Sequence, residues 1–229
     1  MSARIGVVQF PGTNCERDVI EAVEVCGGIG KLLWHQSTEL GGVDAVVIAG
    51  GFAHGDYLRP GAIARFSPIM SVIAEFAAQG GAVVGICNGF QVLTEAGLLP
   101  GALQKNAGLK FRCEQWNLRV VSTNSVLTSR CELGQELSIP INHFEGNFTC
   151  SPQTHAELVA NDQIVLRYVD NPNGSVDDIA GICNAERNVV GLMPHPERAC
   201  HALLGSTDGI ALLGSLIDSC VAARTGVSS

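Results

Sequence analysis

Residues 82–91 read AVVGICNGFQ, and this stretch decides the fold class. Its first part, Ala82 to Cys87, is a short apolar run with β-branched residues on both parities, which indicates a strand buried on both faces. Two similar runs come earlier, Ile5 to Phe10 and Val43 to Ala49. Strands buried on both faces are typical of parallel sheets, so these runs predict an α/β fold with a parallel centre.

Segments with helical periodicity separate these strands. Thr13 and Glu16 have the spacing of a capping box, which predicts a first helix after residue 13. A second helix is predicted from Ser67, as the N-cap, and Pro68 at the first helical position, and a third over 88–96. Strands that alternate with helices place helices on both faces of the sheet.

The second half of the chain is richer in strands. Apolar segments separated by turn-forming residues predict strands with little helix between them, at 118–121, 139–142, 164–169, 179–184 and 189–193. A last helix is predicted near the C-terminus, with Ile210, Leu213 and Ile217 on its apolar face. Since no linker, repeat or low-complexity stretch interrupts the sequence, we expect one domain over residues 1–229, with a mainly parallel central sheet and a β-rich second half.

Composition excludes several classes of function. The chain has 229 residues, of which 46% are hydrophobic and 16% charged, as expected of a folded globular protein. Its net charge of −8 provides no positive field for nucleic acid. No apolar run approaches the roughly 18 residues of a membrane span. We therefore expect neither nucleic acid nor a membrane as a partner, and a cytoplasmic location.

Nine cysteines raise the question of disulfides, metal or a reactive thiol. The closest two, Cys15 and Cys26, are too far apart to form a C-x-x-C pair, so the sequence contains neither a zinc-knuckle nor a thioredoxin-type motif. The count is odd, and the N-terminal apolar run is stopped by Pro11 before a signal-peptide core can form. The sequence predicts free thiols and no metal site.

The junction at Cys87 has the pattern of a nucleophile elbow. A strand ends on the cysteine, a helix begins at once, and Gly85 and Gly89 stand two residues to either side. Such a turn exposes the nucleophile at the carboxyl edge of the sheet, beside a helix N-terminus that favours the thiolate. The pattern predicts a nucleophilic cysteine, and the alternative is a buried core cysteine that ends a strand.

A nucleophilic thiol needs a base, and the segment MPHPER (193–198) offers one. Its two prolines hold the chain extended, so His195 and Glu197 project to the same side. A carboxylate beside the imidazole fixes its tautomer and stabilises the imidazolium. Cys87, His195 and Glu197 are thus a candidate triad, and the alternative is a surface turn with an incidental His–Glu pair.

The strand before Gly50 and Gly51 passes directly into a glycine-rich turn. An acyl-transfer reaction needs backbone N–H donors for its oxyanion, and such a turn next to the elbow supplies one while the Asn88 N–H supplies another. The alternative is that these glycines serve only a tight turn between strand and helix.

These three motifs, in this order, resemble those of the class I (triad) glutamine amidotransferases. The resemblance is stronger still to the glutamine amidotransferase subunits of phosphoribosylformylglycinamidine synthase, and it extends almost from end to end. The segments that carry it are QFPGTNCERD (9–18), GGFAHGDYLRPGAIA (50–64), GICNGFQVL (85–93), LLPGAL (98–103), NHFEGNF (142–148), NPNGS (171–175) and GLMPHPER (191–198).

The resemblance implies a flavodoxin-like fold and a glutaminase reaction. Cys87 would attack the glutamine side-chain amide, His195 would pass the thiol proton to the departing ammonia, and water would release glutamate from the thioester. The residues implied in binding the oxyanion or the glutamine are Gly50, Gly51, Phe52, Asn88, Gln91, His143 and Glu145.

The resemblance also implies a partner. The sequence has no P-loop and no G-x-G-x-x-G after a strand, so we expect no cofactor in this chain. By resemblance, the ammonia passes to a large synthetase subunit that uses ATP and magnesium to convert formylglycinamide ribonucleotide to its amidine in purine biosynthesis, with a small accessory subunit in some assemblies. A local basic group, Lys105, Lys110, Arg112 and Arg119, either docks on that partner or belongs to an ordinary solvated loop.

Two other functions stay open at this point. One is a cysteine hydrolase or peptidase of related fold, in which histidine directly follows the nucleophile; Asn88 occupies that position here. The other is a non-catalytic regulatory subunit that keeps the scaffold, which the presence of Cys87, His195 and Glu197 argues against.

Overall fold

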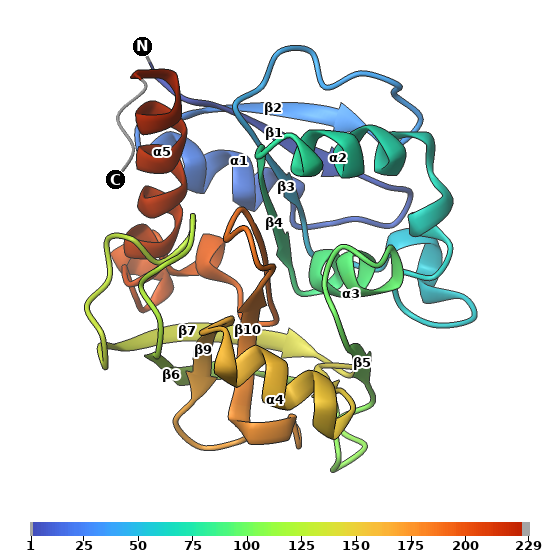
Figure 1. Ribbon diagram of the computed structural model, residues 1–229, viewed down its shortest axis with the longest axis vertical. Coiled ribbons are helices and arrows are strands. Elements are labelled where there is room, and N and C mark those ends of the chain that lie inside the picture. The colour runs from blue at the N-terminus through green and yellow to red at the C-terminus, as the bar shows by residue number, and fades with distance from the viewer. Residues whose placement is uncertain (1, 226–229) are drawn as a thin grey trace.

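The structure is a computed structural model that describes residues 2–225 (Figure 1). Within them, a nine-stranded mixed sheet has the order β2-β1-β3-β4-β11-β10-β9-β6-β7, and β5 pairs separately with β8. The strands are β1 (Arg4–Gln9), β2 (Ile29–Trp34), β3 (Ala45–Ile48), β4 (Ala82–Ile86), β5 (Ala102–Gln104), β6 (Arg112–Val120), β7 (Glu136–His143), β8 (Asn147–Thr149), β9 (Ile164–Tyr168), β10 (Ile179–Cys183) and β11 (Val189–Leu192). The α-helices are α1 (Glu16–Val25), α2 (Pro68–Ala78), α3 (Asn88–Glu95), α4 (Pro152–Ala160) and α5 (Gly209–Thr225).

The sheet has a parallel part and an antiparallel part. Strands β2, β1, β3, β4 and β11 pair in parallel, in the order typical of flavodoxin-like folds. Strands β10, β9, β6 and β7 continue the sheet from β11 in antiparallel pairs. The predicted α/β fold, with a parallel centre and a β-rich second half, is confirmed.

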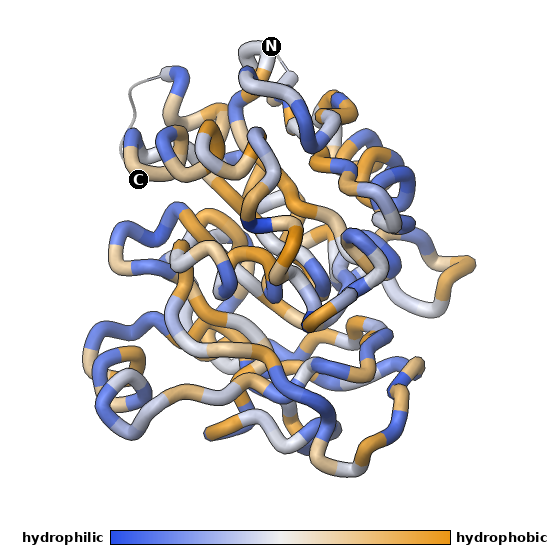
Figure 2. The backbone as a smooth tube through the Cα atoms, turned by 90° about the vertical axis from the view of Figure 1, so that its right-hand side faces the viewer, coloured by the Kyte–Doolittle hydropathy of each residue, from blue (hydrophilic) through white to orange (hydrophobic). Residues whose placement is uncertain are grey.

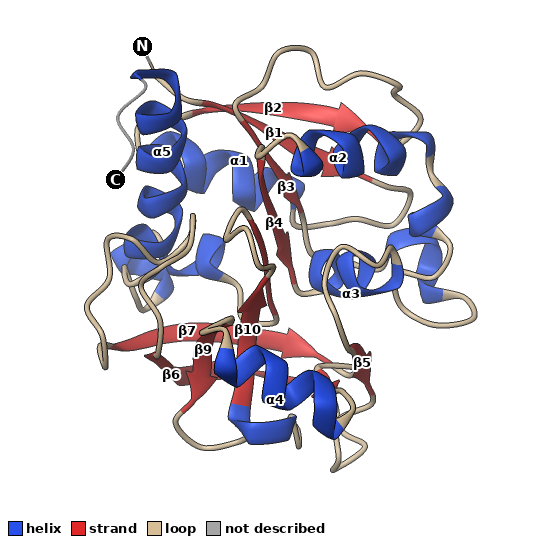
Figure 3. Cartoon of the chain, viewed as in Figure 1, coloured by secondary structure: helices blue, strands red, loops and turns tan. Residues whose placement is uncertain are grey.

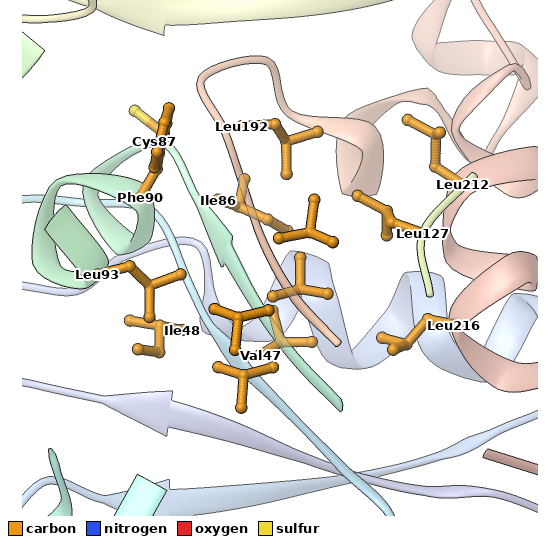
Figure 4. Close-up of a cluster of buried hydrophobic side chains, with 14 of the residues drawn as sticks. Val47, Ile48, Ile86, Cys87, Phe90, Leu93, Leu127, Leu192, Leu212 and Leu216 are labelled. Atoms are coloured by element: carbon orange, nitrogen blue, oxygen red, sulfur yellow. The ribbon is translucent and has the colours of Figure 1, made fainter. Parts of the chain in front are cut away.

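Helices cover both faces of the parallel part, as predicted (Figure 3). Helices α1 and α5 pack together on one face, and α2 and α3 lie on the other. Apolar strand segments run through the middle of the molecule (Figure 2). Figure 4 shows part of this core, which contains Val47 and Ile86 of the neighbouring strands β3 and β4 and Leu216 of α5. Burial on both faces explains why β3 and β4 have continuous apolar sequences.

Several local features differ from the sequence-based expectations; the short strands β5 and β8 were not predicted, and Pro196–Ala199, expected to be extended, forms a 3-10 helix. The Thr13–Glu16 capping box does not form, because α1 begins at Glu16 with Cys15 as N-cap, while the Thr13 hydroxyl accepts from Phe10 N–H at 3.0 Å. Helix α4 was not predicted, although Ser151 caps it by accepting from the Thr154 N–H. Strand β2 was also not predicted; most of its side chains are exposed, so it lacks the continuous apolar run of its neighbours.

The structure shows the state of the cysteines and the length of the apolar helices. None of the nine cysteines is in a disulfide, as predicted, and all lie within the described residues. No helix in the described part of the chain is long and apolar enough to span a membrane.

Candidate active site

Cys87 occupies a strained turn between β4 and α3. Its backbone has φ 52° and ψ −106°, which costs a non-glycine residue about 1–3 kcal/mol. Neither flanking glycine tolerates a Cβ: one at Gly85 would lie 2.6 Å from Gly89 O, and one at Gly89 would overlap Ile48 O. Figure 4 shows the sulfur at the edge of the core, pointing away from it. The elbow geometry predicted from the sequence is therefore present.

His195 and Glu197 form a buried pair. His195 Nδ1 lies 2.6 Å from Glu197 Oε1, and the two side chains are 2% and 0% exposed. The His195 N–H donates to Pro140 O at 2.8 Å, which anchors the segment to β7. Because the pair is buried and close, it is not the incidental surface pair of the alternative reading.

The electrostatic environment of His195 favours its charged form. Burial lowers the pKa of this imidazole and is the largest single effect, but the Glu197 charge and the interactions with Cys87 and Cys15 together outweigh it, so the pKa of His195 lies well above 6.5. Its other nitrogen, Nε2, is buried and has no hydrogen-bond partner among residues 2–225. This nitrogen is available to exchange a proton with a thiol or a substrate.

The side chains of Cys87 and His195 both lie close to Gly50, which has no side chain of its own. A Cβ built on Gly50 would lie 2.9 Å from His195 Cε1 and 3.5 Å from Cys87 Cβ. It would also lie 3.3 Å from the sulfur of Cys15, at the N-terminus of α1. These three side chains thus converge on a point where the chain has room for glycine alone.

The Gly50-Gly51-Phe52 turn offers fewer oxyanion donors than expected. The Phe52 N–H donates to Gly12 O at 3.0 Å, so it is not free for a substrate oxygen. Within residues 2–225 the Gly51 N–H makes no backbone hydrogen bond, and Asn88 is the first residue of α3, where the N–H has no intrahelical acceptor. Gly51 and Asn88 are therefore the candidate donors, and Phe52 contributes a half-exposed ring at the pocket.

The side chains of Asn88 and Gln91 brace the site. Asn88 Oδ1 accepts from Ala53 N–H at 2.9 Å, and Nδ2 donates to Asp56 Oδ1 at 3.1 Å and Gln91 Oε1 at 2.8 Å. Gln91 Nε2 donates to Glu145 O at 2.6 Å. These bonds tie the elbow to the loop after β3 and to the turn after β7, so both amides hold the walls of the site in place.

A small cavity of about 50 Å³ lies between these walls. Its lining joins the ends of four parallel strands to the turn after β7 and consists of Asn14, Cys15, Gly51, Phe52, Asp56, Cys87, Gln91, Phe111, Asn142, His143, Phe144, Glu145 and His195. This volume is on the scale of one or two water molecules. Seven of the predicted site residues line this cavity: Gly51, Phe52, Cys87, Gln91, His143, Glu145 and His195. The other three, Gly50, Asn88 and Glu197, are not among its lining residues.

Two titratable side chains in the cavity are shifted by burial. Burial lowers the pKa of His143 to about 4, with the nearby charge of His195 adding to the effect, so this imidazole is neutral. Burial also raises the pKa of Asp56 to about 6; the hydrogen bond from Asn88 opposes the rise and the Glu145 charge adds to it. Both shifts disfavour additional charge beside the Cys87–His195 pair.

The chain matches a family model over most of its length. Residues 2–208 match the family model described as a CobB/CobQ-like glutamine amidotransferase domain. The chain belongs to the glutamine amidotransferase family. A cysteine at the carboxyl edge of the sheet, facing a buried His–Glu pair, is thus found in an amidotransferase chain.

Individual relatives of this amidotransferase agree with the family match. The chain is 54% identical over 214 residues to the phosphoribosylformylglycinamidine synthase subunit PurQ of Rubrobacter xylanophilus, covering 93% of this chain and 97% of that protein. It is 55% identical to the PurQ subunit of Helicobacter hepaticus, covering 93% and 96%. Among solved structures, it superposes on a chain of PurLQS from Thermotoga maritima with a TM-score of 0.89 and 40% identity, covering 96% and 99%.

Sequence reasoning missed several residues of this amidotransferase site, above all Cys15 and Asp56. Cys15 follows β1 as Gly50 follows β3, and the carboxyl ends of parallel strands lie at one edge of a sheet. That rule was a usable signal for Cys15. Asp56 reaches the cavity only through the left-handed conformations of His54 and Asp56, which no sequence pattern indicated.

The basic group before and along β6 is not a free patch of positive charge. Arg112 lies 3.2 Å from Glu114, and Arg119 lies 2.8 Å from Glu136. Lys105 sits over the ring of Phe144 at 5.9 Å. Because two of the four cations are paired with carboxylates of this chain, charge alone gives little support to a docking role.

Proposed function

We propose that this chain is the glutaminase subunit of a phosphoribosylformylglycinamidine synthase and uses Cys87, His195 and Glu197 as its catalytic triad. One observation carries the chemistry: Cys87 is held at a strained strand-to-helix turn, facing a histidine whose other nitrogen is fixed by a buried carboxylate. Identity of more than half of the aligned residues to PurQ subunits, over 93% of the chain, supports the substrate and pathway.

The reaction follows from these positions. His195 Nε2 holds the proton released by the Cys87 thiol, and the resulting thiolate attacks the carbon of the glutamine side-chain amide. The N–H groups of Gly51 and Asn88 stabilise the tetrahedral oxyanion, each donor contributing roughly 10²–10³ in rate. His195 then protonates the amide nitrogen, ammonia leaves, and a γ-glutamyl thioester forms on Cys87.

Hydrolysis of the thioester completes the cycle. His195 takes a proton from water, the hydroxide attacks the thioester carbon, and glutamate leaves as the thiol is restored. Throughout, Glu197 keeps Nδ1 protonated and stabilises the imidazolium, as the third member of such triads does. The net reaction converts glutamine and water into glutamate and ammonia.

The wall after β7 is proposed to bind the α-amino acid part of glutamine. Glu145 lines the cavity, and its backbone is fixed by Gln91. A carboxylate there attracts the α-ammonium group, while Phe52 and Phe111 at the same cavity pack on the methylene groups.

The ammonia is proposed to pass to a large synthetase subunit. Ammonia is protonated in neutral water and loses its nucleophilicity, so direct delivery protects it. The structurally similar chain comes from PurLQS, which supports an assembly of this kind, with a small accessory subunit in some forms. ATP and magnesium are proposed to bind the synthetase, and the assembly is proposed to be cytoplasmic.

The test compares two nitrogen sources in the reconstituted complex. We expect Cys87→Ala to lower glutamine-dependent synthesis at least about 10³-fold while ammonium-dependent synthesis stays within about twofold, because only the ammonia source is lost. Cys113→Ala, at an exposed cysteine of β6, is the matched control and should leave both rates unchanged. Loss of both activities in Cys87→Ala would show that Cys87 is structural, and loss of neither would refute the proposed nucleophile.

A further inference from the structure

A pair of cysteines lies behind the candidate active site, where α1 packs on η4 (Pro196–Ala199), the short 3-10 helix that follows His195. Cys26 is the C-cap residue of α1, and Cys200 is the C-cap residue of η4. Both belong to one small apolar cluster that also contains Ala22, one helical turn before Cys26. The proposed glutaminase reaction uses neither thiol.

The two thiols are hydrogen-bonded to each other. This bond is the largest influence on the pKa of Cys26 and lowers it; burial opposes the effect, and the charge of Arg130 adds to it. The same bond, together with burial, raises the pKa of Cys200. Burial also raises the pKa of Cys131 and Cys220. Cys26 is therefore the thiol of the pair that ionises and attacks an oxidant.

A small oxidant can reach this pair. Cys26 is half-buried at the end of α1. Cys200 lines a cavity of about 360 Å³ between α1 and η4, together with Val25 and Leu204, which are about half exposed. Such a volume holds several water molecules, so it also admits a molecule of the size of hydrogen peroxide.

Cys200 is linked directly to the turn that carries the proposed base. Its S–H donates to Pro196 O at 3.2 Å, and Pro196 stands between His195 and Glu197. Glu197 in turn holds His195 Nδ1 at 2.6 Å. A sulfur in a disulfide has no proton to donate, so oxidation of Cys200 removes the hydrogen bond to Pro196 O.

We propose that Cys26 and Cys200 form a reversible disulfide on exposure to hydrogen peroxide, and that this bond slows the proposed glutaminase reaction. The Cys26 thiolate attacks one oxygen of the peroxide, the O–O bond breaks, hydroxide leaves, and Cys26 becomes a sulfenic acid. The Cys200 sulfur then displaces the hydroxyl group; the S–S bond forms, and the Cys200 proton leaves with the hydroxyl as water. Two electrons pass from the thiols to the peroxide, and a thiol reductant reverses the step.

The effect on the site follows from the geometry of a disulfide, and it rests on the proposed function. An S–S bond of about 2.05 Å is shorter than a contact between two thiols, so it draws η4 toward α1. Pro196 O loses its thiol donor at the same time. A displacement of 1 Å in a catalytic group costs up to about 10²-fold in rate. We therefore expect the disulfide to slow glutamine hydrolysis by about tenfold or more.

Peptide mapping of the full chain tests the disulfide and does not depend on glutaminase activity. The reduced chain is treated with hydrogen peroxide, its remaining thiols are blocked with iodoacetamide, and it is digested with trypsin without reductant. We expect a species that joins residues 18–31 to residues 199–224 and that a thiol reductant separates. Since 199–224 contains both Cys200 and Cys220, fragment ions must place the bond at Cys200. Absence of this linkage, or a bond at Cys220, would overturn the proposal.

Two variants sharpen the assignment. Cys113→Ser, at an exposed cysteine of β6, should form the linkage as the wild type does. Cys200→Ser removes the thiol that displaces the hydroxyl group, so Cys26 should stay a sulfenic acid and react with dimedone more strongly than in the wild type. Equal dimedone labelling of Cys26 in the two proteins would show that Cys200 is not its partner.

Synthesis by the reconstituted complex tests the effect on the site separately. After peroxide treatment, glutamine-dependent synthesis by the wild type should fall about tenfold or more below that of Cys26→Ser treated in the same way, with equal ammonium-dependent synthesis. Direct oxidation of Cys87 affects both proteins alike. Equal losses would refute the effect on the site. A complex with no glutamine-dependent synthesis before treatment would refute the proposed function instead, and the peptide map would still decide whether the disulfide forms.

Discussion

The parallel and antiparallel parts of the sheet contribute to the site in different ways. Cys87 and His195 follow β4 and β11, two adjacent parallel strands that are buried along their whole length. His143 ends β7 and Glu145 follows it; β7 is an antiparallel edge strand whose residues alternate between buried and partly exposed. The parallel part thus carries the proposed reacting groups, and the antiparallel part carries a wall of the cavity.

This difference has a physical basis. Strands buried on both faces fix backbone positions to within a fraction of an ångström, because every side chain is close-packed. A nucleophile and its base need that precision. A wall that binds and releases a substrate needs to move, and an edge strand with one solvated face permits this. Substitutions in the two parts should therefore affect different kinetic constants.

The largest expected effect is the contrast between two carboxylates. Glu197→Gln leaves the shape of the parallel part intact but removes the charge that stabilises the His195 imidazolium. We expect kcat for glutamine hydrolysis by the complex to fall about 10²–10⁴-fold with KM changed little. Glu145→Gln, in the antiparallel part, should raise KM about tenfold and leave kcat within a few-fold. Steady-state kinetics on both variants measures the split.

The pH dependence of the same variants provides a control. Burial lowers the pKa of His195 and the Glu197 charge is the largest influence that raises it, so loss of this charge should shift the pKa seen in the kcat/KM profile downward. Glu145→Gln should leave that pKa in place. If Glu197→Gln changed KM alone, the division of roles between the two parts would be wrong.

The next effect concerns the rigidity of the elbow. A Cβ at Gly89 would overlap the carbonyl oxygen of Ile48, so Gly89→Ala must push α3 away from β3. We expect the free energy of unfolding to fall by about 3 kcal/mol or more. Gly108→Ala is the matched control, because nothing lies within 4 Å of its Cβ and its φ is not positive; its effect should stay within about 0.5 kcal/mol. Urea denaturation measures both, and equal effects would contradict the packing argument.

A smaller effect is expected at Asp56, in the loop between β3 and α2. Its folded pKa of about 6 exceeds the ordinary value of 3.8, so the folded state binds the proton more tightly. Stability contributed by the protonated form is present at low pH and is lost as the pH rises through about 4–6. Asp56→Asn should remove this loss. Because solvent screens a partly exposed group, we expect a gain of about 1 kcal/mol above pH 6, a Tm rise of about 2–4 °C.

Thermal unfolding at pH 4 and pH 7 distinguishes this account from a general stabilisation. The variant should match the wild type at pH 4 and exceed it at pH 7. A gain of the same size at both pH values would show that the Asp56 charge is not its cause.

The smallest effect is expected on the outer surface of the antiparallel part. Arg119 and Glu136 are about half exposed, at 51% and 50%, and exposed ion pairs contribute little. Arg119→Ala should change the free energy of unfolding by less than about 0.5 kcal/mol, measured by urea denaturation at low salt. A loss above 1 kcal/mol would show that this edge of the sheet is more tightly coupled to the core than its alternating burial indicates.

The sequence was most informative where a single local pattern determined the structure. The run from Ala82 to Cys87 predicted β4 and the elbow, because burial on both faces leaves a continuous apolar sequence. His195 and Glu197 were paired correctly, but the extended conformation predicted from the two prolines was wrong, because Pro196–Ala199 forms a short 3-10 helix that starts after His195. Ser67 and Pro68 predicted the start of α2. Ser151 and Pro152 have the same pattern at the start of α4, although that helix was not predicted.

Features that depend on the neighbours of a strand were harder to predict. The Phe52 N–H donates its hydrogen bond to the carbonyl oxygen of Gly12. Gly12 lies forty residues earlier in the chain, and the two residues meet only in the folded protein. Cys15 meets His195 for the same reason. Strand β2 is exposed at Ile29 and Trp34, so its pattern resembled a loop. These features depend on strand order, which no single segment encodes.

Trapping of the covalent intermediate tests most directly the claim that the parallel part performs the chemistry through Cys87. The complex is mixed with glutamine, quenched in acid during turnover, digested and examined by mass spectrometry. We predict a γ-glutamyl adduct on the peptide that contains Cys87, and none on the peptide that contains Cys15. An adduct on Cys15, or turnover of glutamine with no adduct on Cys87 at any quench time, would contradict the account.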